Sequence, residues 1–591
     1  MAGFFGKCGA APACLFAVSG LIAASAQAHV YDHVYGSGFE TVATPASDAE
    51  AARFLTQASF GPTTAEIARV RALGYEEWIA QELGKPATLA RPTVEQVITA
   101  LTQGGQGTGQ TQRLNRWFWT AAYAPDQLRQ RMAFALSQIF VISDQSSALS
   151  QDVIPMTEYW DTLARGAFGT YRSLLGEVTY SPSMGQYLSH YHNKKATDTA
   201  QPDENYAREV MQLFSIGLVQ RNLDFSPVLA AGQPIPTYDQ TTITETAKVF
   251  TGFTYIDAPT GTGTAHTGAN FNGGGLTNAA QYSPMACWGT EIFPAEGSNN
   301  GSRYMYHDVG VKHLVAGLDL PAGQTCHQDV DAALDILAGH ANVAPFMARQ
   351  LIQRFVTSNP SPGYIQRVAQ VFEDNGLADH ERGDLGAVVR AILMDDEARQ
   401  APASANFGKL REPVLRLTAM WRAWNAVPQA PTAYGEVKMV GTLNFVTAFG
   451  QRPMSSPTVF NFYEPDYQQP GAIADAGLFA PEFQITNEST VYTLSNGLYA
   501  FSAGAYVGMS GTAPTDRPLL DLSGLAAKAH SGDYAGMVAD ANRLMLYGSM
   551  PAAMQTTLQN MLAFMSGATD LEKSWSLVYL VAISPNYAAQ R

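Results

Sequence analysis

The hydrophobic positions of this chain recur mainly at helical spacing. From Asp48 onward, the apolar side chains of residues 51–58 fall three and four positions apart, which predicts a first helix. Gly61-Pro62-Thr63 marks a turn, and a second helix is expected over residues 64–73, ended by Gly74. The same spacing returns in residues 159–168, 205–218, 244–250, 330–337, 343–355, 365–372, 385–393, 413–424, 551–564 and 574–583.

Strand-like alternation is scarce, and no repeat of solenoid period is present. A stretch rich in Gly, Asn and Thr at about 255–300 predicts a surface insertion. No linker separates two cores after Asp48. The pattern therefore predicts a mostly α protein, with one large multi-helical domain over residues 48–591 and long loops.

The N-terminus has the pattern of a secretory signal peptide. Lys7 precedes a short run of small and apolar residues, 13–24, and Ala26-Gln27-Ala28 is a small-x-small cleavage site. We expect a signal peptide at 1–28 and a flexible tether at 29–47. No later segment supplies the roughly 20 apolar residues that a membrane anchor needs. The expected location is the periplasm or the external medium.

Composition narrows the classes of partner. The 591 residues are 46% hydrophobic and 15% charged, with a formal net charge of −15 and no basic runs. Such a chain is a poor candidate for binding nucleic acid or an anionic membrane surface.

The cysteines agree with an exported protein. Cys8 and Cys14 fall in the signal peptide, which leaves Cys287 and Cys326. An even pair in an oxidising compartment predicts a disulfide, with two free buried thiols as the alternative. Two cysteines alone do not form a zinc site, which usually has four ligands.

The helix predicted near residue 205 contains an acid on its apolar face. At about 100° per residue, Glu209 projects between Leu213 and Ile216. Arg208 and Glu204 project to the opposite side and form an ordinary i, i+4 pair.

A carboxylate in that position must find a cation, a metal or hydrogen-bond donors, because its unpaired burial costs several kcal/mol. Asn205, four residues before Glu209, is placed to hydrogen-bond to it. Glu209 is therefore a candidate general base or metal ligand, and the alternative is a buried ion pair that fixes helix packing.

A second polar constellation follows the aromatic segment 304–306. His307, Asp308 and Lys312 bring an imidazole, a carboxylate and an ammonium together, which suits acid–base chemistry. Adjacent His and Asp side chains diverge in an extended segment, so they form no triad by themselves. Lys312 is a possible partner for a buried acid such as Glu209. The alternative is a polar network that organises a loop.

Other motifs give weaker indications of a reaction or a metal site. His190 and His192 have a metal-chelating spacing, but the lysines beside them indicate a solvated loop. Thr242 and Glu245 have the spacing of a capping box that begins a helix. Nucleophile-elbow, P-loop and zinc-protease motifs are absent, so the sequence assigns no cofactor and leaves metal binding open.

Several blocks, in order along the chain, resemble the bacterial domain-of-unknown-function 1800 family from about Asp48 to Arg591. The matching blocks are residues 53–63, 204–209, 251–253, 307–312, 450–453, 456–463 and 583–587. Members of that family are exported, mostly helical proteins without an assigned function. They are often encoded beside a second exported family, domain of unknown function 1501, which is similar to sulfatases and phosphatases.

The resemblance implies a shared polar centre. The family pattern includes residues matched here by Asn205, Arg208 and Glu209, and by His307 and Asp308. This chain departs from the pattern at Phe214-Ser215, where many members carry histidine and threonine, and at His192, where aspartate is common. If those positions supply ligands or a base in other members of the family, the activity in this chain is altered or lost.

Two hypotheses follow. The first is a hydrolase or lyase acting on an extracellular polymer, with Glu209 transferring the proton and His307 as its acid–base partner. Asn205, Asp308 and Lys312 would then orient groups or stabilise charge. The second is a non-catalytic scaffold or accessory protein for an exported sulfatase- or phosphatase-like partner, expected from the domain-of-unknown-function 1501 family.

Overall fold

The computed structural model describes residues 44–255, 282–287, 293–294, 303–304, 306–400, 406–507 and 514–591. The predicted signal peptide, most of the tether and most of the insertion at 255–300 lie outside these residues. In the described part of the chain, no helix combines the length and the apolar character needed to cross a membrane.

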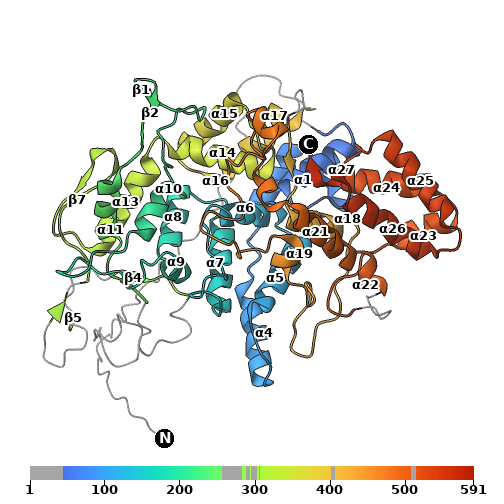
Figure 1. Cartoon of the computed structure of the whole chain (residues 1–591), viewed down its shortest axis with the longest axis horizontal. Coiled ribbons are helices and arrows are strands. Elements are labelled where there is room, and N and C mark those ends of the chain that lie inside the picture. Colours follow the sequence, from blue (N-terminus) through green and yellow to red (C-terminus); the bar gives the residue numbers. More distant parts are fainter. Residues whose placement is uncertain are drawn as a thin grey trace, which may run out of the picture.

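The structure is built from helices, as the sequence pattern predicted (Figure 1). The first part of the chain forms α1 Asp48–Ala58, α2 Thr64–Leu73, α3 Tyr75–Leu83, α4 Arg91–Gln103, α5 Gln110–Tyr123, α6 Gln127–Ser137, α7 Val153–Gly166, α8 Tyr171–Thr179, α9 Pro182–Tyr187, α10 Asn205–Gln212, α11 Gln240–Val249, α13 Cys326–Gly339 and α14 Val343–Phe355. The later helices are α15 Pro362–Glu373, α16 Leu385–Met394, α17 Asp396–Arg399, α18 Pro413–Ala423, α19 Phe445–Phe449, α20 Ala472–Asp475, α21 Glu488–Ala500, α22 Ala503–Val507, α23 Ser523–His530, α24 Tyr534–Leu546, α25 Ala552–Phe564, α26 Asp570–Ala582 and α27 Pro585–Ala588. The described residues also include the 3₁₀ turns η2 Val315–Gly317 and η3 Pro481–Ile485.

Every strand in the described residues is two residues long and belongs to an antiparallel pair. The pairs are β1 Leu229–Ala230 with β2 Gln233–Pro234, β3 Phe253–Thr254 with β4 Ala286–Cys287, β5 Phe293–Pro294 with β6 Arg303–Tyr304, β7 Lys312–His313 with β8 Asp319–Leu320, and β9 Lys409–Leu410 with β10 Ala589–Gln590. These ladders tie loops together and build no sheet layer.

Local sequence signals explain where the first helices begin and end. The Ser47 side chain accepts a hydrogen bond from the backbone N–H of Glu50 and caps α1. Thr63 caps α2 in the same way, and Gly74, with φ 82°, ends it. The predicted helix over residues 64–73 is therefore confirmed residue for residue.

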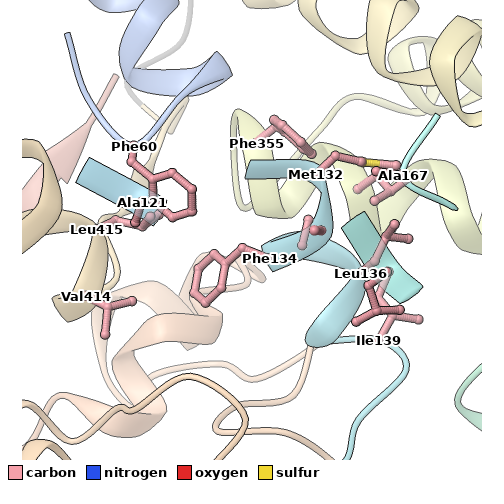
Figure 2. Packing of buried hydrophobic residues seen from close by; sticks show 14 of the residues in the cluster. Phe60, Ala121, Met132, Phe134, Leu136, Ile139, Ala167, Phe355, Val414 and Leu415 are labelled. Atoms are coloured by element: carbon pink, nitrogen blue, oxygen red, sulfur yellow. The ribbon is translucent and has the colours of Figure 1, made fainter. Parts of the chain in front are cut away.

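Helix α6 lies at the centre of the hydrophobic core. All of its residues, Gln127–Ser137, are buried, so it packs against neighbours on every side. Figure 2 shows Met132 and Phe134 leaving α6 in different directions, with the sulfur of Met132 beside Ala167. The Phe60 and Phe134 rings lie 6.0 Å apart. Buried hydrophobic residues from Ala51 to Tyr587 belong to one continuous cluster.

The start and the end of the described chain meet beside this core (Figure 1). The Arg53 guanidinium in α1 donates a hydrogen bond of 3.1 Å to the carbonyl of Arg591. Strand β10, near the C-terminus, pairs with β9. The division of the chain into domains stays a prediction.

A disulfide joins Cys287 of β4 to Cys326, the first residue of α13, with Cα atoms 5.7 Å apart. The predicted pairing is therefore confirmed. Because Cys287 faces Phe253 across the β3–β4 ladder, the bond ties the segment after α11 to the start of α13.

We expect Cys287→Ser to lower the calorimetric melting temperature, because a closed loop of 39 residues restricts the unfolded chain. The chain-entropy model gives about 4 kcal/mol for a loop of this length. A strong reductant should shift the wild type by the same amount and leave the variant unchanged. Equal melting of the two proteins without reductant would contradict this role.

Candidate functional site

Helix α10 places Glu209 where its periodicity predicted. Glu209 is only 6% exposed, whereas Glu204 and Arg208 lie on the solvent side and form an ion pair of 3.1 Å. The N-cap of the helix is Glu204, and the carboxylate of Asp203 before it accepts the backbone N–H of Asn205 at 2.8 Å. The prediction of a carboxylate on the buried face of this helix is confirmed.

The surroundings of Glu209 leave part of its carboxyl group without a partner. Its Oε2 atom is buried and accepts no hydrogen bond from any residue that the structure describes. Burial raises the pKa of Glu209 above its ordinary range, and the neighbouring Arg208 cation offsets only part of that effect. The group therefore holds its proton to a higher pH than an exposed glutamate does.

Two tyrosines lie within electrostatic reach of this carboxyl group. Burial, followed by the charge of Glu209, raises the pKa of both Tyr187 and Tyr238 to about 12. The Tyr238 hydroxyl is itself buried and has no hydrogen-bond partner within the described chain. An acid and a phenol with free hydrogen-bonding capacity therefore share one buried region, and periodicity alone gave no sign of the tyrosines.

The predicted hydrogen bond between Asn205 and Glu209 is not formed. Asn205 lies one turn before Glu209, but no bond joins the two side chains in the structure, and both residues are described. Asn205 is half-buried, at the start of the helix.

The second predicted constellation forms a closed ionic cluster centred on Asp329. The Asp329 Oδ2 atom lies 2.9 Å from His307 Nε2 and 2.6 Å from Lys312 Nζ, and all three side chains are fully buried. The acid that Lys312 meets is thus Asp329 and not Glu209. On its other side, His307 Nδ1 lies 2.9 Å from the carbonyl oxygen of Thr251. Both ring nitrogens of His307 therefore lie within hydrogen-bond distance of protein oxygen atoms.

Asp308 holds the backbone of the same loop. Its carboxylate accepts the N–H of Gly310 at 2.8 Å, its own N–H donates to Thr251 Oγ1 at 2.9 Å, and its carbonyl accepts from Lys312 Nζ at 2.6 Å. The structure therefore brings His307, Asp308 and Lys312 together around the end of α11 and the start of α13. No hydrogen bond or ion pair between described residues connects this cluster to Glu209.

Sequence reasoning missed Asp329, which lies 22 residues after His307 in the first turn of α13. An acid at that helix position is ordinarily explained by the helix dipole. In the sequence, Lys312 alone indicated such an acid, because a lysine that becomes buried requires an anion beside it.

The remaining sequence candidates have structural partners. His190 is buried, its Nε2 lies 2.9 Å from the Thr179 carbonyl oxygen, and burial lowers its pKa to about 4. In the described ranges, no three His, Cys, Asp or Glu side chains gather closely enough to hold a metal. The predicted capping box at Thr242 is wrong, because α11 begins earlier, with Asp239 as its cap, and Glu245 pairs with Lys248.

A cavity of about 720 Å³ was also missed. It lies beside α14 and the chain that follows α10, and its lining includes Gln212 and Leu213, one turn after Glu209. The lining also includes Tyr463 from block 456–463. Its polar residues come from segments far apart in sequence.

We expect Asp329→Asn to lower the melting temperature sharply, because it leaves Lys312 buried without its anion. Breaking a buried ion pair costs about 3–5 kcal/mol. Asp335→Asn on the same helix is the matched control, since Asp335 is exposed and pairs only with Arg172 at the surface; its melting temperature should barely change. Similar melting temperatures for the two variants would rule out an anchoring role for the cluster.

Comparison with known proteins places the chain in a family. The family model described as "Protein of unknown function (DUF1800)" matches residues 53–589, nearly the whole chain. No curated protein and no solved structure matches this chain. The matched range includes both Glu209 and the cluster around Asp329, as the resemblance of the sequence blocks implied. The protein therefore belongs to the DUF1800 family of proteins of unknown function.

Proposed function

We propose that the protein is an exported hydrolase or lyase that acts on an extracellular polymer, with Glu209 as the proton-transferring group. The observation that carries the proposal is the buried Glu209 carboxyl group, whose pKa is raised and whose Oε2 atom has no partner among the described residues. Buried carboxyl groups with a perturbed pKa are candidates for acid–base catalysis.

The same carboxyl group serves either reaction class. In hydrolysis, the protonated form gives its proton to the leaving oxygen, as in glycoside hydrolysis. In elimination, the ionised form removes a proton from carbon while a second group protonates the leaving oxygen. Both reactions are favoured when the pKa of Glu209 lies closer to neutrality than that of an ordinary glutamate.

For the second group we propose Tyr238, and not His307. The Tyr238 hydroxyl is within electrostatic reach of Glu209 and has no hydrogen-bond partner in the described chain. His307 is fully buried and holds acceptors on both ring nitrogens, so serving a substrate would require the Asp329 cluster to open. Asp308 and Lys312 then support the loop and not the reaction.

The second candidate function is a non-catalytic scaffold for an exported partner, as expected from the neighbouring family 1501. The observation that favours it is the closed His307–Asp329–Lys312 cluster, which has the burial and pairing of a packing anchor. A stoichiometric partner that co-purifies with the wild type and equally with Glu209→Gln would favour the scaffold.

We expect Glu209→Gln to lower turnover by at least about a hundredfold, since a positioned acid or base contributes roughly 10²–10⁴-fold. The assay screens polysaccharide, sulfate-ester and peptide substrates, with and without the expected partner. Glu204→Gln, on the exposed side of the same helix, is the control and should stay within a few fold. Full activity of Glu209→Gln, or no turnover on any substrate, would overturn the enzyme proposal.

We also expect Glu209→Gln to raise the melting temperature at neutral pH. The pKa of Glu209 is higher in the folded state than in the unfolded state, so its favourable contribution exists at low pH and is lost as the pH rises through the folded value. The gain of the variant over the wild type should therefore begin to grow near pH 4.5, the ordinary pKa of a glutamate, and level off once the pH has passed the folded value. A variant that is less stable at neutral pH would indicate a structural ion pair instead.

A further inference from the structure

The cavity beside α14 has an aromatic wall and a cationic floor. Phe225, Phe346, Phe460 and Phe479 contribute apolar surface, and α14 contributes Arg349 and Arg354. Its volume of about 720 Å³ lies within the range of pockets that hold small organic ligands.

Arg349 is held rigidly in this floor. It is 8% exposed, and its guanidinium lies between the rings of Phe225 and Phe479, at 4.7 Å and 4.9 Å from their centroids. Burial lowers the pKa of Arg349 to about 10, although Asp466 acts in the opposite direction. The side chain is therefore still charged at neutral pH. Its Nη2 atom donates to the carbonyl of Pro465 at 3.2 Å.

Arg354 is buried more deeply and lacks acceptors. It is 2% exposed, with its guanidinium 4.8 Å from the centroid of the Tyr463 ring. Its Nε and Nη1 atoms are buried and donate to no group in the described residues. Two buried N–H groups without an acceptor lower the stability of the folded protein, unless a ligand in the cavity accepts their hydrogen bonds.

The charges beneath the cavity do not balance. Among the described residues, the cations of Arg131, Arg354 and Lys409 face two buried carboxylates, Glu412 and Glu482. Lys409 Nζ lies 2.8 Å from Glu482 and 3.8 Å from Glu412. Glu412 Oε1 and Glu482 Oε2 are buried and accept no hydrogen bond from the described residues.

The pKa of Glu412 reflects the cations around it. Burial alone would raise the pKa of Glu412, but Lys409, Arg131 and Arg354 together hold it below its ordinary value. Arg131 also keeps Nε and Nη1 without an acceptor in the described chain. Three buried cations thus act on two buried carboxylates in this group.

The acids at the cavity mouth do not supply the missing charge. Glu464 and Asp466 line the cavity but are exposed, where water and salt screen their charge. The cations lie on the floor and the carboxylates at the rim. An anion that enters the cavity therefore reaches the floor with its charge largely unopposed.

We propose that this cavity binds a small organic anion, with a carboxylate, sulfate or phosphate group against Arg354 and Arg349 and an apolar or ring-shaped body against the phenylalanines. Planar guanidinium groups match such oxyanions with paired hydrogen bonds. The inference goes beyond the proposed function, because binding in the cavity does not require Glu209 to be catalytic.

Calorimetric titration of the chain with phenyl sulfate, phenyl phosphate and benzoate tests the proposal. At least one of these should bind with 1:1 stoichiometry, while the neutral benzyl alcohol should not. Inorganic sulfate and phosphate should bind at least about tenfold more weakly than their phenyl esters. If benzyl alcohol bound as tightly as benzoate, the proposal that the ligand is an anion would be wrong. If inorganic sulfate and phosphate bound as tightly as their phenyl esters, the proposal that the ligand has an organic body would be wrong.

Two variants locate the site. Arg349→Gln should weaken binding at least about tenfold, the usual effect of losing a charged hydrogen-bond partner. Phe460→Asp places a negative charge on an exposed part of the wall, where folding is not at risk, and should weaken binding similarly. Arg543→Gln, outside the cavity, removes the same charge as a control and should bind like the wild type. No binding by the wild type, or unchanged binding in both cavity variants, would refute the proposal.

Discussion

The pairing of buried charges is the interaction on which this helical fold depends. Only 15% of the residues are charged, yet several of them lie inside the protein, where an unpaired charge costs several kcal/mol. Asp144 illustrates the solution, since it binds Arg113 at 2.9 Å and Arg452 at 2.8 Å. Its two partners come from opposite halves of the chain. Such a pair can form only when the remote segments are correctly placed, so buried ion pairs fix how the helices assemble.

Against this background, two of the places where buried polar groups lack a partner bear on function, because one holds a buried acid and the other lines a cavity. One is Glu209 with Tyr238, and the other is the cavity floor around Arg354. They are connected along the chain, because Gln212 and Leu213, one turn after Glu209, line the cavity. Proteins retain destabilising groups mainly where a ligand or a reaction uses them. The His307 cluster differs in charge, since Lys312 and Asp329 form a buried ion pair, although Asp329 Oδ1 accepts no hydrogen bond from the described residues.

The sequence predicted those features that depend on local periodicity or composition. Thr64–Leu73, the burial of Glu209, the pair of Glu204 with Arg208, and the disulfide were all predictable for that reason. Helical spacing says which face of a helix is buried, but it does not say which remote residue lies across from that face.

Asp329, Tyr238 and the arginines of α14 were missed for this physical reason. Residues 343–355 showed only helical spacing in the sequence, which does not say what the arginines of that helix face. Only the fold shows that Arg349 and Arg354 reach a cavity whose other wall comes from residues 459–479. The start of α11 was misplaced because Asp239 and Thr242 are both good caps, and the backbone geometry selects Asp239.

The central claim is that Glu209 is a buried carboxyl group whose protonation changes nearer to neutrality than that of an ordinary glutamate. Infrared difference titration of the wild type against Glu209→Gln measures it directly, because the variant removes one carboxyl band. We predict that the band of Glu209 titrates with a pKa above 4.5, the ordinary value of a glutamate. A carboxyl group that is already fully ionised at pH 4 would mean that Glu209 is paired, and would contradict the account.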